Sequence, residues 1–526
     1  MLLRDIQTRQ ASAAARSLCV AGGIVFFVAT EWQHGEELWK TDGTPAGTGL
    51  VKDLRPGSLG SSPELLTAVG SMVFFEAVAD PATGWQLWKS DGSDAGTIQL
   101  TSLGTNFPPQ HLTAVGSTLF FTAYDPVNGN ALWRSDGTPG GTLVVSQIRS
   151  GGAPSQPDHL IAVNLAGLGA TLFFTVDDGS NGNELWMSDG TTLGTKMVAQ
   201  IQPGSGSSSP DNLTAMGGKV YFSADDGTHG IELWVSDGTS AGTTMVADIN
   251  PAGSSAPSLL AAAGSTLYFF ADDGTHGREL WNYTPGSGPP SMVKDIVAGS
   301  GSLSGLSQGT AAGSQYFFVA NDGVHGYELW VSDGTSGGTG MVLDINPSGS
   351  SFPQMLVPVG STLFFIADDG VHGQELWKSD GTSAGTTLAL DLYPGSSGSS
   401  IASGIAKGAE LWFAADDSIH GVEVWRSDGT PGGTVMAANV GLGTASSFPG
   451  GVAVCGPRVF FSAYEDVHGM ELWTSDGTTA GTVLVKDINP GSASGGAFNI
   501  TSAGSFVYFE ASDGINGYEL WRSDGT

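Results

Sequence analysis

The sequence predicts an all-β fold: a β-propeller built as a single closed ring of eleven four-stranded blades. Three observations support this prediction. A motif similar to H-G-x-E-L-W-x-S-D-G-T recurs through the whole chain, about every 48 residues. Each unit holds several short runs of β-forming residues separated by Gly-rich turns, which is typical of propeller blades. Long stretches of 3.6-residue periodicity, which helical repeats of this length need, are not visible in the sequence.

The tryptophan of the motif marks the units. Its eleven copies are Trp39, Trp88, Trp133, Trp186, Trp234, Trp281, Trp330, Trp377, Trp425, Trp473 and Trp521. A Gly stands four residues before each copy, as expected where a turn requires a positive φ angle. Propellers usually have about 4 to 8 blades, so the number eleven rests on the repeat itself.

Residues 211–250 serve as the type unit, and four strands are predicted in it. The first two are 211–216 and 220–224, joined by a Gly-Gly turn. The third strand, 231–236, carries the Glu-Leu-Trp sequence, and the fourth is 243–249. The turns 226–230 and 237–239 contain the Asp-Gly pairs that are typical of tight β-turns.

The third strand indicates how the blades stack. Leu233 and Trp234 are adjacent in the sequence, so their side chains point to opposite faces of the strand. Both are large and apolar, which predicts that both faces of the sheet are covered. A blade packed between two neighbouring blades meets this requirement.

The two ends of the chain predict how the ring closes. In most units an Asp follows the Trp by fourteen residues, but only five residues follow Trp521. Asp5 lies where the equivalent Asp of the last unit would fall if the ring closed. Residues 1–6 are therefore predicted to complete the blade formed by 492–526, so that 1–526 is one repeat domain. Two smaller rings, or a segment of a longer array, are the alternatives.

Composition narrows the classes of partner and of site. The net charge is −32, with 19 Lys and Arg against 51 Asp and Glu, which argues against nucleic acid as a partner. Membrane insertion is not expected either, because no apolar run reaches about 18 residues. Two cysteines are too few for a disulfide scaffold or a Cys-based zinc site.

The repeated acids are the candidates for a metal site. An acidic residue stands eight positions before every Trp, and His stands five positions before seven of them. The simplest interpretation is structural, with the Asp capping its own turn. The alternative is Ca²⁺, which prefers carboxylate and carbonyl oxygens; no cofactor is required by the sequence. The candidate metal ligands are Asp226, Asp273, Asp322, Asp369 and Asp417.

Residues that break the repeat are the candidates for ligand binding. Six aromatic residues in or beside the predicted second-to-third loops differ from unit to unit. Exposed aromatic side chains can stack on sugars or anchor a peptide, although they can equally pack on a neighbouring loop. The six are Trp32, Trp85, Tyr124, Tyr327, Tyr464 and Tyr518.

On the repeated motif the chain resembles the bacterial secreted proteins named for their E-L-W-x-x-D-G-T repeats, sometimes grouped with hyalin-type repeats. The resemblance covers essentially the whole chain. It implies an exported or cell-surface propeller, and it brings no catalytic residue set with it. The chain departs from the pattern after Trp281, where the Asp-Gly-Thr turn is missing, and at Ala131, where Glu is usual.

These observations lead to an expectation of function. We expect a non-catalytic extracellular recognition or scaffold module, with no catalytic residues, that binds a glycan or an extracellular protein through its loop face or central channel. We expect it to act as a monomer or as part of a larger surface protein. The competing hypothesis is a polysaccharide-acting hydrolase or lyase with one site among the irregular loops. Secretion is inferred from the resemblance, since no signal peptide is recognised in these residues.

Overall fold

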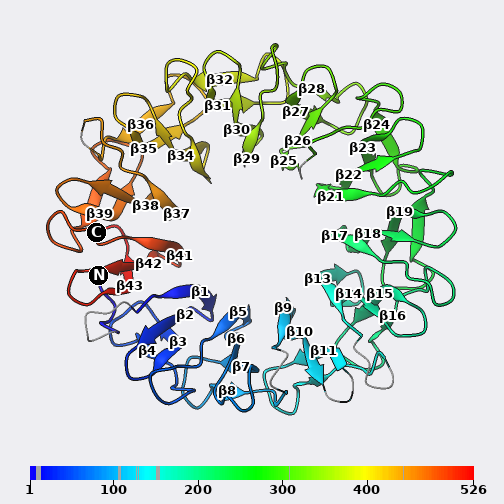
Figure 1. Ribbon diagram of the computed structural model, residues 1–526, viewed down its shortest axis with the longest axis horizontal. Helices are drawn as coiled ribbons and strands as arrows, with labels where there is room; N and C mark the ends of the chain where they lie inside the picture. Colours follow the sequence, from blue (N-terminus) through cyan, green and yellow to red (C-terminus); the bar gives the residue numbers. More distant parts are fainter. Residues whose placement is uncertain are drawn as a thin grey trace.

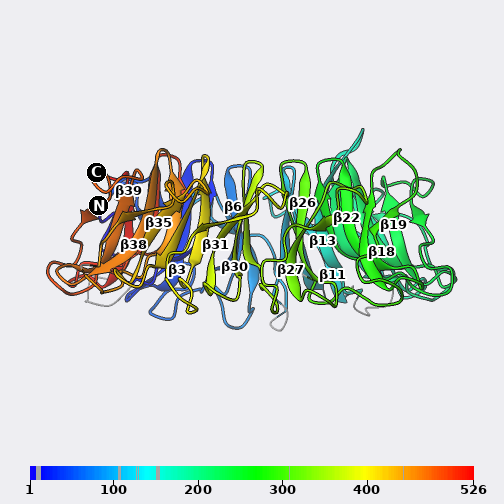
Figure 2. The same ribbon diagram turned by 90° about the horizontal axis from the view of Figure 1, so that it is seen from above.

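The computed structural model describes residues 1–526 except 7–12, 105–107, 126, 128, 150–154, 307–308 and 442. It is an all-β ring of eleven antiparallel sheets, each with its strands in sequence order from the centre outward (Figure 1). Seen from the edge, the ring is a flat disc with loops on both faces (Figure 2). None of the described residues forms a helix with the length and apolarity of a membrane span. We number the blades from 1, with Trp39, to 11, with Trp521.

The strands fall into four sets. The innermost set is β1 (Arg16–Ala21), β5 (Glu64–Val69), β9 (Gln110–Val115), β13 (Asp158–Leu165), β17 (Asp211–Met216), β21 (Ser258–Ala263), β25 (Thr310–Ala312), β29 (Gln354–Val359), β33 (Ala402–Lys407), β37 (Gly450–Cys455) and β41 (Phe498–Ala503). The second set is β2 (Ile24–Glu31), β6 (Met72–Ala77), β10 (Thr118–Asp125), β14 (Gly169–Asp177), β18 (Lys219–Asp225), β22 (Thr266–Asp272), β26 (Gln315–Asn321), β30 (Thr362–Asp368), β34 (Glu410–Asp416), β38 (Arg458–Glu465) and β42 (Phe506–Ser512).

The third set carries the Trp of the motif. It consists of β3 (Gly35–Thr41), β7 (Gln86–Ser90), β11 (Gly129–Ser135), β15 (Asn183–Ser188), β19 (Ile231–Ser236), β23 (Arg278–Tyr283), β27 (Tyr327–Ser332), β31 (Gln374–Ser379), β35 (Val422–Ser427), β39 (Gly469–Ser475) and β43 (Tyr518–Ser523). The outermost set is β4 (Gly49–Leu50), β8 (Ile98–Gln99), β12 (Leu143–Val144), β16 (Lys196–Met197), β20 (Thr244–Ala247), β24 (Ser291–Lys294), β28 (Gly340–Met341), β32 (Thr387–Leu390), β36 (Val435–Ala438) and β40 (Val483–Lys486).

The core lies between the blades, as the Leu-Trp pair predicts. Trp234 packs with Phe173 and Leu185 of blade 4. Its neighbour Leu233 packs with Phe269 of blade 6 on the other face of the sheet. The same division recurs around the ring, so each blade is held by apolar contacts with both neighbours.

A buried glutamate holds the loop that leads from one blade to the next. Glu232, two residues before Trp234, is 0% exposed. Its carboxylate accepts hydrogen bonds from the backbone N–H of Ile249 and Ser255 and from the Ser255 hydroxyl. A buried acceptor that meets three donors fixes the path of the loop, because each donor would otherwise lose a bond it makes with water. This explains why the motif uses Glu here.

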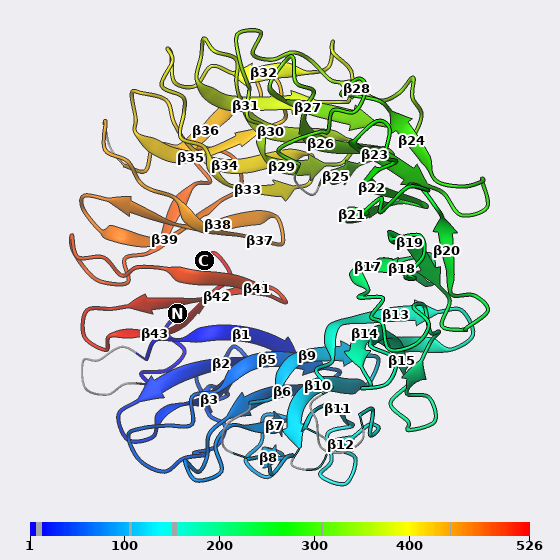
Figure 3. The same ribbon diagram turned by 45° about the vertical axis from the view of Figure 1, so that its right-hand side comes forward.

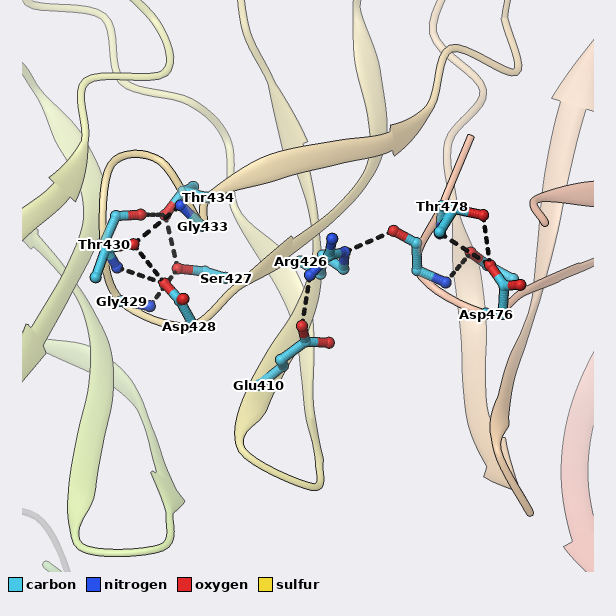
Figure 4. A network of polar contacts seen from close by, with 12 residues as sticks. Glu410, Arg426, Ser427, Asp428, Gly429, Thr430, Gly433, Thr434, Asp476 and Thr478 are labelled. Atoms are coloured by element: carbon cyan, nitrogen blue, oxygen red, sulfur yellow. Dashed lines mark hydrogen bonds and ion pairs between the residues drawn. The ribbon is translucent and has the colours of Figure 1, made fainter. Parts of the chain in front are cut away.

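The Ser-Asp-Gly-Thr turn closes the outer hairpin by itself. In blade 9 the Asp428 carboxylate accepts from the N–H and the hydroxyl of Thr430, and Ser427 bonds to Thr434 (Figure 4). Next to it, Arg426 pairs with Glu410 and donates to the carbonyl of Gly477 in the corresponding turn of blade 10. The turns are thus self-contained units with occasional links between blades.

The ring closes through the N-terminus, as predicted. The backbone of Leu3 donates to Leu520, that of Arg522 donates to Met1, and Leu2 forms a bridge with Trp521. Leu3 and Ile6 are 1% and 2% exposed and pack in the cluster that joins blades 11 and 1. Figure 3 shows β43 beside the N-terminus and β1. The alternative of two smaller rings is therefore wrong.

Candidate functional site

The repeated loop aspartates are occupied within their own turns. Asp226 Oδ1 accepts from the backbone N–H of Thr228 and of His229, and its Oδ2 lies 2.6 Å from His229 Nδ1. The same pattern holds at Asp273, Asp322, Asp369 and Asp417. Burial opposes ionisation, but the bonds from His229 and Thr228 hold the pKa of Asp226 below its usual value. The bond to Asp226 raises the pKa of His229.

In most units an Asp stands fourteen residues after the Trp, and in two of them it lies near the loop histidine. His372 Nε2 is 4.0 Å from Asp391 Oδ2, and His34 Nε2 is 3.8 Å from Asp53 Oδ2. One buried oxygen of each such Asp has no hydrogen-bond partner: Asp5, Asp53, Asp248, Asp295, Asp344, Asp391 and Asp487. Within the described ranges, however, no three His, Cys, Asp or Glu side chains gather closely enough to hold a metal ion. The loops therefore present Asp-His pairs, with a second carboxylate within 4.0 Å of the imidazole at His34 and His372.

The six aromatic candidates do not form one site. All six are half-buried, and they are spread over blades 1, 2, 3, 7, 10 and 11: Trp32, Trp85, Tyr124, Tyr327, Tyr464 and Tyr518. Tyr327 stacks on Phe352, with ring centroids 5.6 Å apart, and Tyr518 packs on Phe498 at 5.8 Å. Packing therefore accounts for these two, on a loop residue at Phe352 and on the first residue of β41 at Phe498.

A different set of residues, on the wall of the central opening, combines titratable groups with a pocket. Nearly every inner strand has a β-bulge after its first residue, where the pairing with the second strand shifts. The residue after that first one has a positive φ: 53° at His111, 52° at His159 and 56° at Asn212. His and Asn are among the residues that tolerate this conformation best. β9, β13 and β17 carry them on adjacent blades (Figure 1).

Each of the two histidines faces an aspartate of the next blade. His159 Nε2 lies 3.6 Å from Asp211 Oδ1, and His111 Nε2 lies 3.9 Å from Asp158 Oδ1. These side chains are 45–61% exposed, so they are open to solvent in the central opening. Asp211 Oδ1 also accepts from the backbone N–H of Asn212, which holds the carboxylate in place.

A buried hydroxyl orients each imidazole. Thr175 Oγ1 is 3.2 Å from His159 Nδ1 and donates to the carbonyl of Asp158. Because that hydroxyl proton is used, its oxygen accepts from Nδ1–H, and Nε2 of the neutral ring is an acceptor. Thr122 holds His111 in the same way, 3.3 Å from Nδ1.

The exposed Nε2 and the carboxylate therefore form a pair of acceptors that face one another. At 3.6 Å they are too far apart for a direct hydrogen bond. Two adjacent acceptors are stabilised by a donor placed between them, such as a water molecule, a hydroxyl group or an ammonium group. The pair is thus suited to hold a water molecule and to take a proton from it.

A pocket of about 400 Å³ opens beside His159 and Asp211. Its other walls are apolar side chains of three blades, including Ile161, Leu213 and Leu259, together with the polar residues Asn212 and Thr214. A second pocket of similar volume continues from Ile161 and Leu213 to Tyr316. An apolar group bound here lies next to the polar pair.

This site was missed at the sequence level, although one signal pointed to it. Seven of the nine histidines occupy the repeated position five residues before Trp. His111 and His159 are the two that do not. Only the fold brings them beside aspartates that lie about 50 residues further along the chain.

No protein-family model and no curated protein matches the sequence. Among solved structures the chain is similar to a puromycin hydrolase, at 14% identity, 68% coverage of this chain and 58% of that chain, with a TM-score of 0.30. A prolyl endopeptidase is 16% identical, with 70% of this chain and 56% of that chain covered and a TM-score of 0.31. The tricorn protease is 13% identical, with 95% of this chain and 47% of that chain covered and a TM-score of 0.25. The chain thus spans about half the length of these structures.

The comparison corrects the expectation of function. The prediction of a non-catalytic recognition or scaffold module, and that of no enzyme activity, are contradicted, since the structures that the chain resembles are those of enzymes. At this level of identity the likeness extends to the propeller fold alone. The reaction has to be argued from the residues of this chain.

Proposed function

We propose that the protein is a hydrolytic enzyme whose active site is the His159–Asp211 pair on the wall of the central opening. The observation that supports this is the acceptor pair itself, a solvent-exposed imidazole nitrogen 3.6 Å from a carboxylate oxygen. The adjoining pocket supplies a place for a substrate.

In the proposed reaction a water molecule donates one hydrogen bond to His159 Nε2 and the other to Asp211. As the water oxygen attacks a carbonyl carbon, its proton passes to Nε2, which acts as general base. The imidazolium is stabilised by the Asp211 carboxylate, and it returns the proton to the leaving group as the bond to the carbonyl carbon breaks. Thr175 positions the imidazole without contacting the substrate, since it is 1% exposed.

Charge and pocket chemistry indicate the substrate class. A net charge of −32 repels polyanions, which disfavours polyuronates and nucleic acids. Leu213 and Leu259 favour an aliphatic group beside the scissile bond. We therefore propose a peptide or peptide-like amide with an aliphatic side chain. The His111–Asp158 pair is a second, similar arrangement with a longer separation.

The test is hydrolysis of a panel of aminoacyl and peptidyl p-nitroanilides by the whole chain and by two variants. His159→Asn keeps a side chain that the chain itself uses at the bulge, at Asn212. We expect it to lower kcat/KM at least 100-fold, in line with loss of a general base. Ser403→Asn, the same type of change at the bulge of blade 9, is the control and should leave kcat/KM unchanged. Absence of turnover by the wild type, or full activity of His159→Asn, would contradict the proposal.

The resemblance to E-L-W-x-x-D-G-T proteins adds a proposal on location. It supports a secreted or cell-surface protein that works as a monomer or within a larger surface protein. Fractionation of the native host, with detection of the chain by antibody, would test this.

A further inference from the structure

The tips of the second-to-third loops differ between two parts of the ring. In blades 7 to 11 the residue six positions before Trp is aliphatic and 57–80% exposed. In blades 4, 5 and 6 the same position holds exposed Ser180, Thr228 and Thr275, while blade 3 also carries an exposed valine there, Val127 at 65%. The aliphatic tips are Val324, Val371, Ile419, Val467 and Ile515. Each tip lies in the loop just before the third strand of its blade, so the repeat puts all five on the same face of adjacent blades, those of β27, β31, β35, β39 and β43.

Two exposed phenylalanines lie in the fourth-to-first loops of the same part of the ring. Phe352 and Phe448 are 51% and 62% exposed, and both have a φ of 47°. Ser209 and Ala256 occupy the same loop position in blades 5 and 6. A bulky residue at positive φ is an outlier. Phe352 stacks on Tyr327, whereas neither burial nor backbone preference explains Phe448, which is 62% exposed.

The two kinds of loop lie on one face. In a four-stranded antiparallel blade the second-to-third and fourth-to-first connections emerge at the same end of the sheet. Contacts agree with this, because Ser254 of a fourth-to-first loop accepts from the backbone N–H of Ile231, which follows a second-to-third loop. We call the five aliphatic tips together with Phe352 and Phe448 the apolar arc.

The surroundings of the apolar arc are acidic. The loops 322–326, 369–373, 417–421, 466–468 and 513–517 each contain Asp, the first four also contain His, and none contains Lys or Arg. The fourth-to-first loops 344–353, 391–401, 439–449 and 487–497 also lack Lys and Arg. The charge complementarity therefore favours a partner with basic groups between apolar ones.

We propose that the apolar arc is a docking surface for a protein segment that presents aliphatic side chains flanked by Lys or Arg. A second copy of this chain is disfavoured, because it would bring two acidic faces together. A lipid surface is disfavoured because the aspartates within two or three residues of each tip would lose water on insertion. This inference is independent of the hydrolytic site, which lies on the inner strands of blades 4 and 5.

The experiment uses a peptide of alternating Leu and Lys as the probe, and a peptide of alternating Ser and Lys as its equally charged control. The variant carries Val324→Thr, Val371→Thr, Ile419→Thr, Val467→Thr and Ile515→Thr together. Thr is native at this position in blades 5 and 6, so folding should be preserved, and an unchanged Tm checks this. We expect the variant to bind the Leu-Lys peptide at least tenfold more weakly than the wild type does, measured by calorimetry at fixed salt.

The Ser-Lys peptide should bind both proteins weakly and equally, because their charges are identical. Equal affinity of the two proteins for the Leu-Lys peptide would overturn the proposal. Two other outcomes would overturn it as well. One is sedimentation of the wild type, but not of the variant, with phosphatidylcholine vesicles, and the other is a dimer of the wild type that the variant does not form.

Discussion

The outer turns and the inner strands of the same blades differ in how strictly their residues repeat. The Ser-Asp-Gly-Thr turns repeat the same bonds: Asp237 accepts from Thr239 just as Asp428 accepts from Thr430. The inner strands repeat the backbone with its bulge, but the bulge residues differ from blade to blade: Leu65, His111, His159, Asn212, Leu259 and Met355. The repeated residues build the ring, and the departures from the repeat give particular blades their chemistry.

The largest effect is expected from breaking the ring itself. Deletion of residues 1–6 removes Leu3 and Ile6 from the cluster between blades 11 and 1 and leaves β43 with an unpaired edge. Loss of two buried aliphatic side chains costs about 5 kcal/mol. Thermal unfolding and size-exclusion chromatography should show a lower Tm and aggregation. An unchanged melting curve would mean that the closing contacts are not needed.

A smaller effect is expected at one repeated residue. Glu232→Ala leaves three buried donors without an acceptor, which should destabilise the protein by about 3 kcal/mol or more. Glu232→Gln is the matched control, because blade 2 has Gln86 at this position, where it accepts from Leu103 N–H. It should cost about 1 kcal/mol. Denaturant unfolding distinguishes the two, and equal losses would argue against this role for the carboxylate.

The repeated residues also predict how stability depends on pH. Burial raises the pKa of five glutamates of this set to about 7: Glu37, Glu279, Glu375, Glu423 and Glu471. A raised pKa in the folded state gives stability that is present below the unfolded pKa, about 4.3, and is lost as pH rises through 7. The raised pKa of His229 acts in the same direction, with its stability lost above about 6.5.

The turn aspartates act in the opposite direction. Bonds from Thr239 lower the pKa of Asp237, and Thr430 lowers that of Asp428 in the same way. Their stability is therefore present above about 3.9, the unfolded pKa, and is lost as pH falls through the folded value. We expect the Tm to be higher near pH 5 than at pH 8, measured by calorimetry at constant ionic strength. A Tm that rises steadily from pH 5 to pH 8 would contradict the assignment of the buried glutamates.

The smallest effect is expected at the loop aspartates. Asp226→Asn should cost about 1 kcal/mol or less, since Asn also caps such turns. A chelator should leave the Tm nearly unchanged, because the Asp226 oxygens already accept bonds from Thr228 and His229. A fall of the Tm by several degrees that Ca²⁺ reverses and Mg²⁺ does not would instead indicate a bound cation. Its ligands would be the unpartnered oxygens of Asp248 and the equivalent aspartates of other blades.

The fold could be predicted because the same pattern of strand and turn residues recurs in eleven units of the sequence. The strands expected at 211–216 and 231–236 are β17 and β19, and the one expected at 243–249 is shorter, as β20 (Thr244–Ala247). The motif is broken in blade 6, after Trp281, but all four strands form there. The shortest inner strand is β25 (Thr310–Ala312) of blade 7. A strand can pair through its backbone without the usual turn sequence, so the missing motif was a poor guide.

The site could not be predicted in the same way. The bulge in β13 turns His159 toward Asp211 and so decides which residues face one another across the two blades. No feature of the local sequence predicts that bulge. The aromatic candidates were chosen for their departure from the repeat, which was the right principle. The candidates were taken from the loops, whereas the histidines that depart from the repeat, His111 and His159, lie on the inner strands.

The most direct test of the account is to measure Tm and kcat/KM side by side for His159→Asn and Glu232→Gln. If departures from the repeat carry chemistry and repeated residues carry the fold, His159→Asn loses turnover while its Tm stays within about one degree of the wild type. Glu232→Gln should then lower the Tm while its folded fraction keeps the wild-type kcat/KM. A His159→Asn variant that melts earlier yet hydrolyses as fast as the wild type would contradict the account.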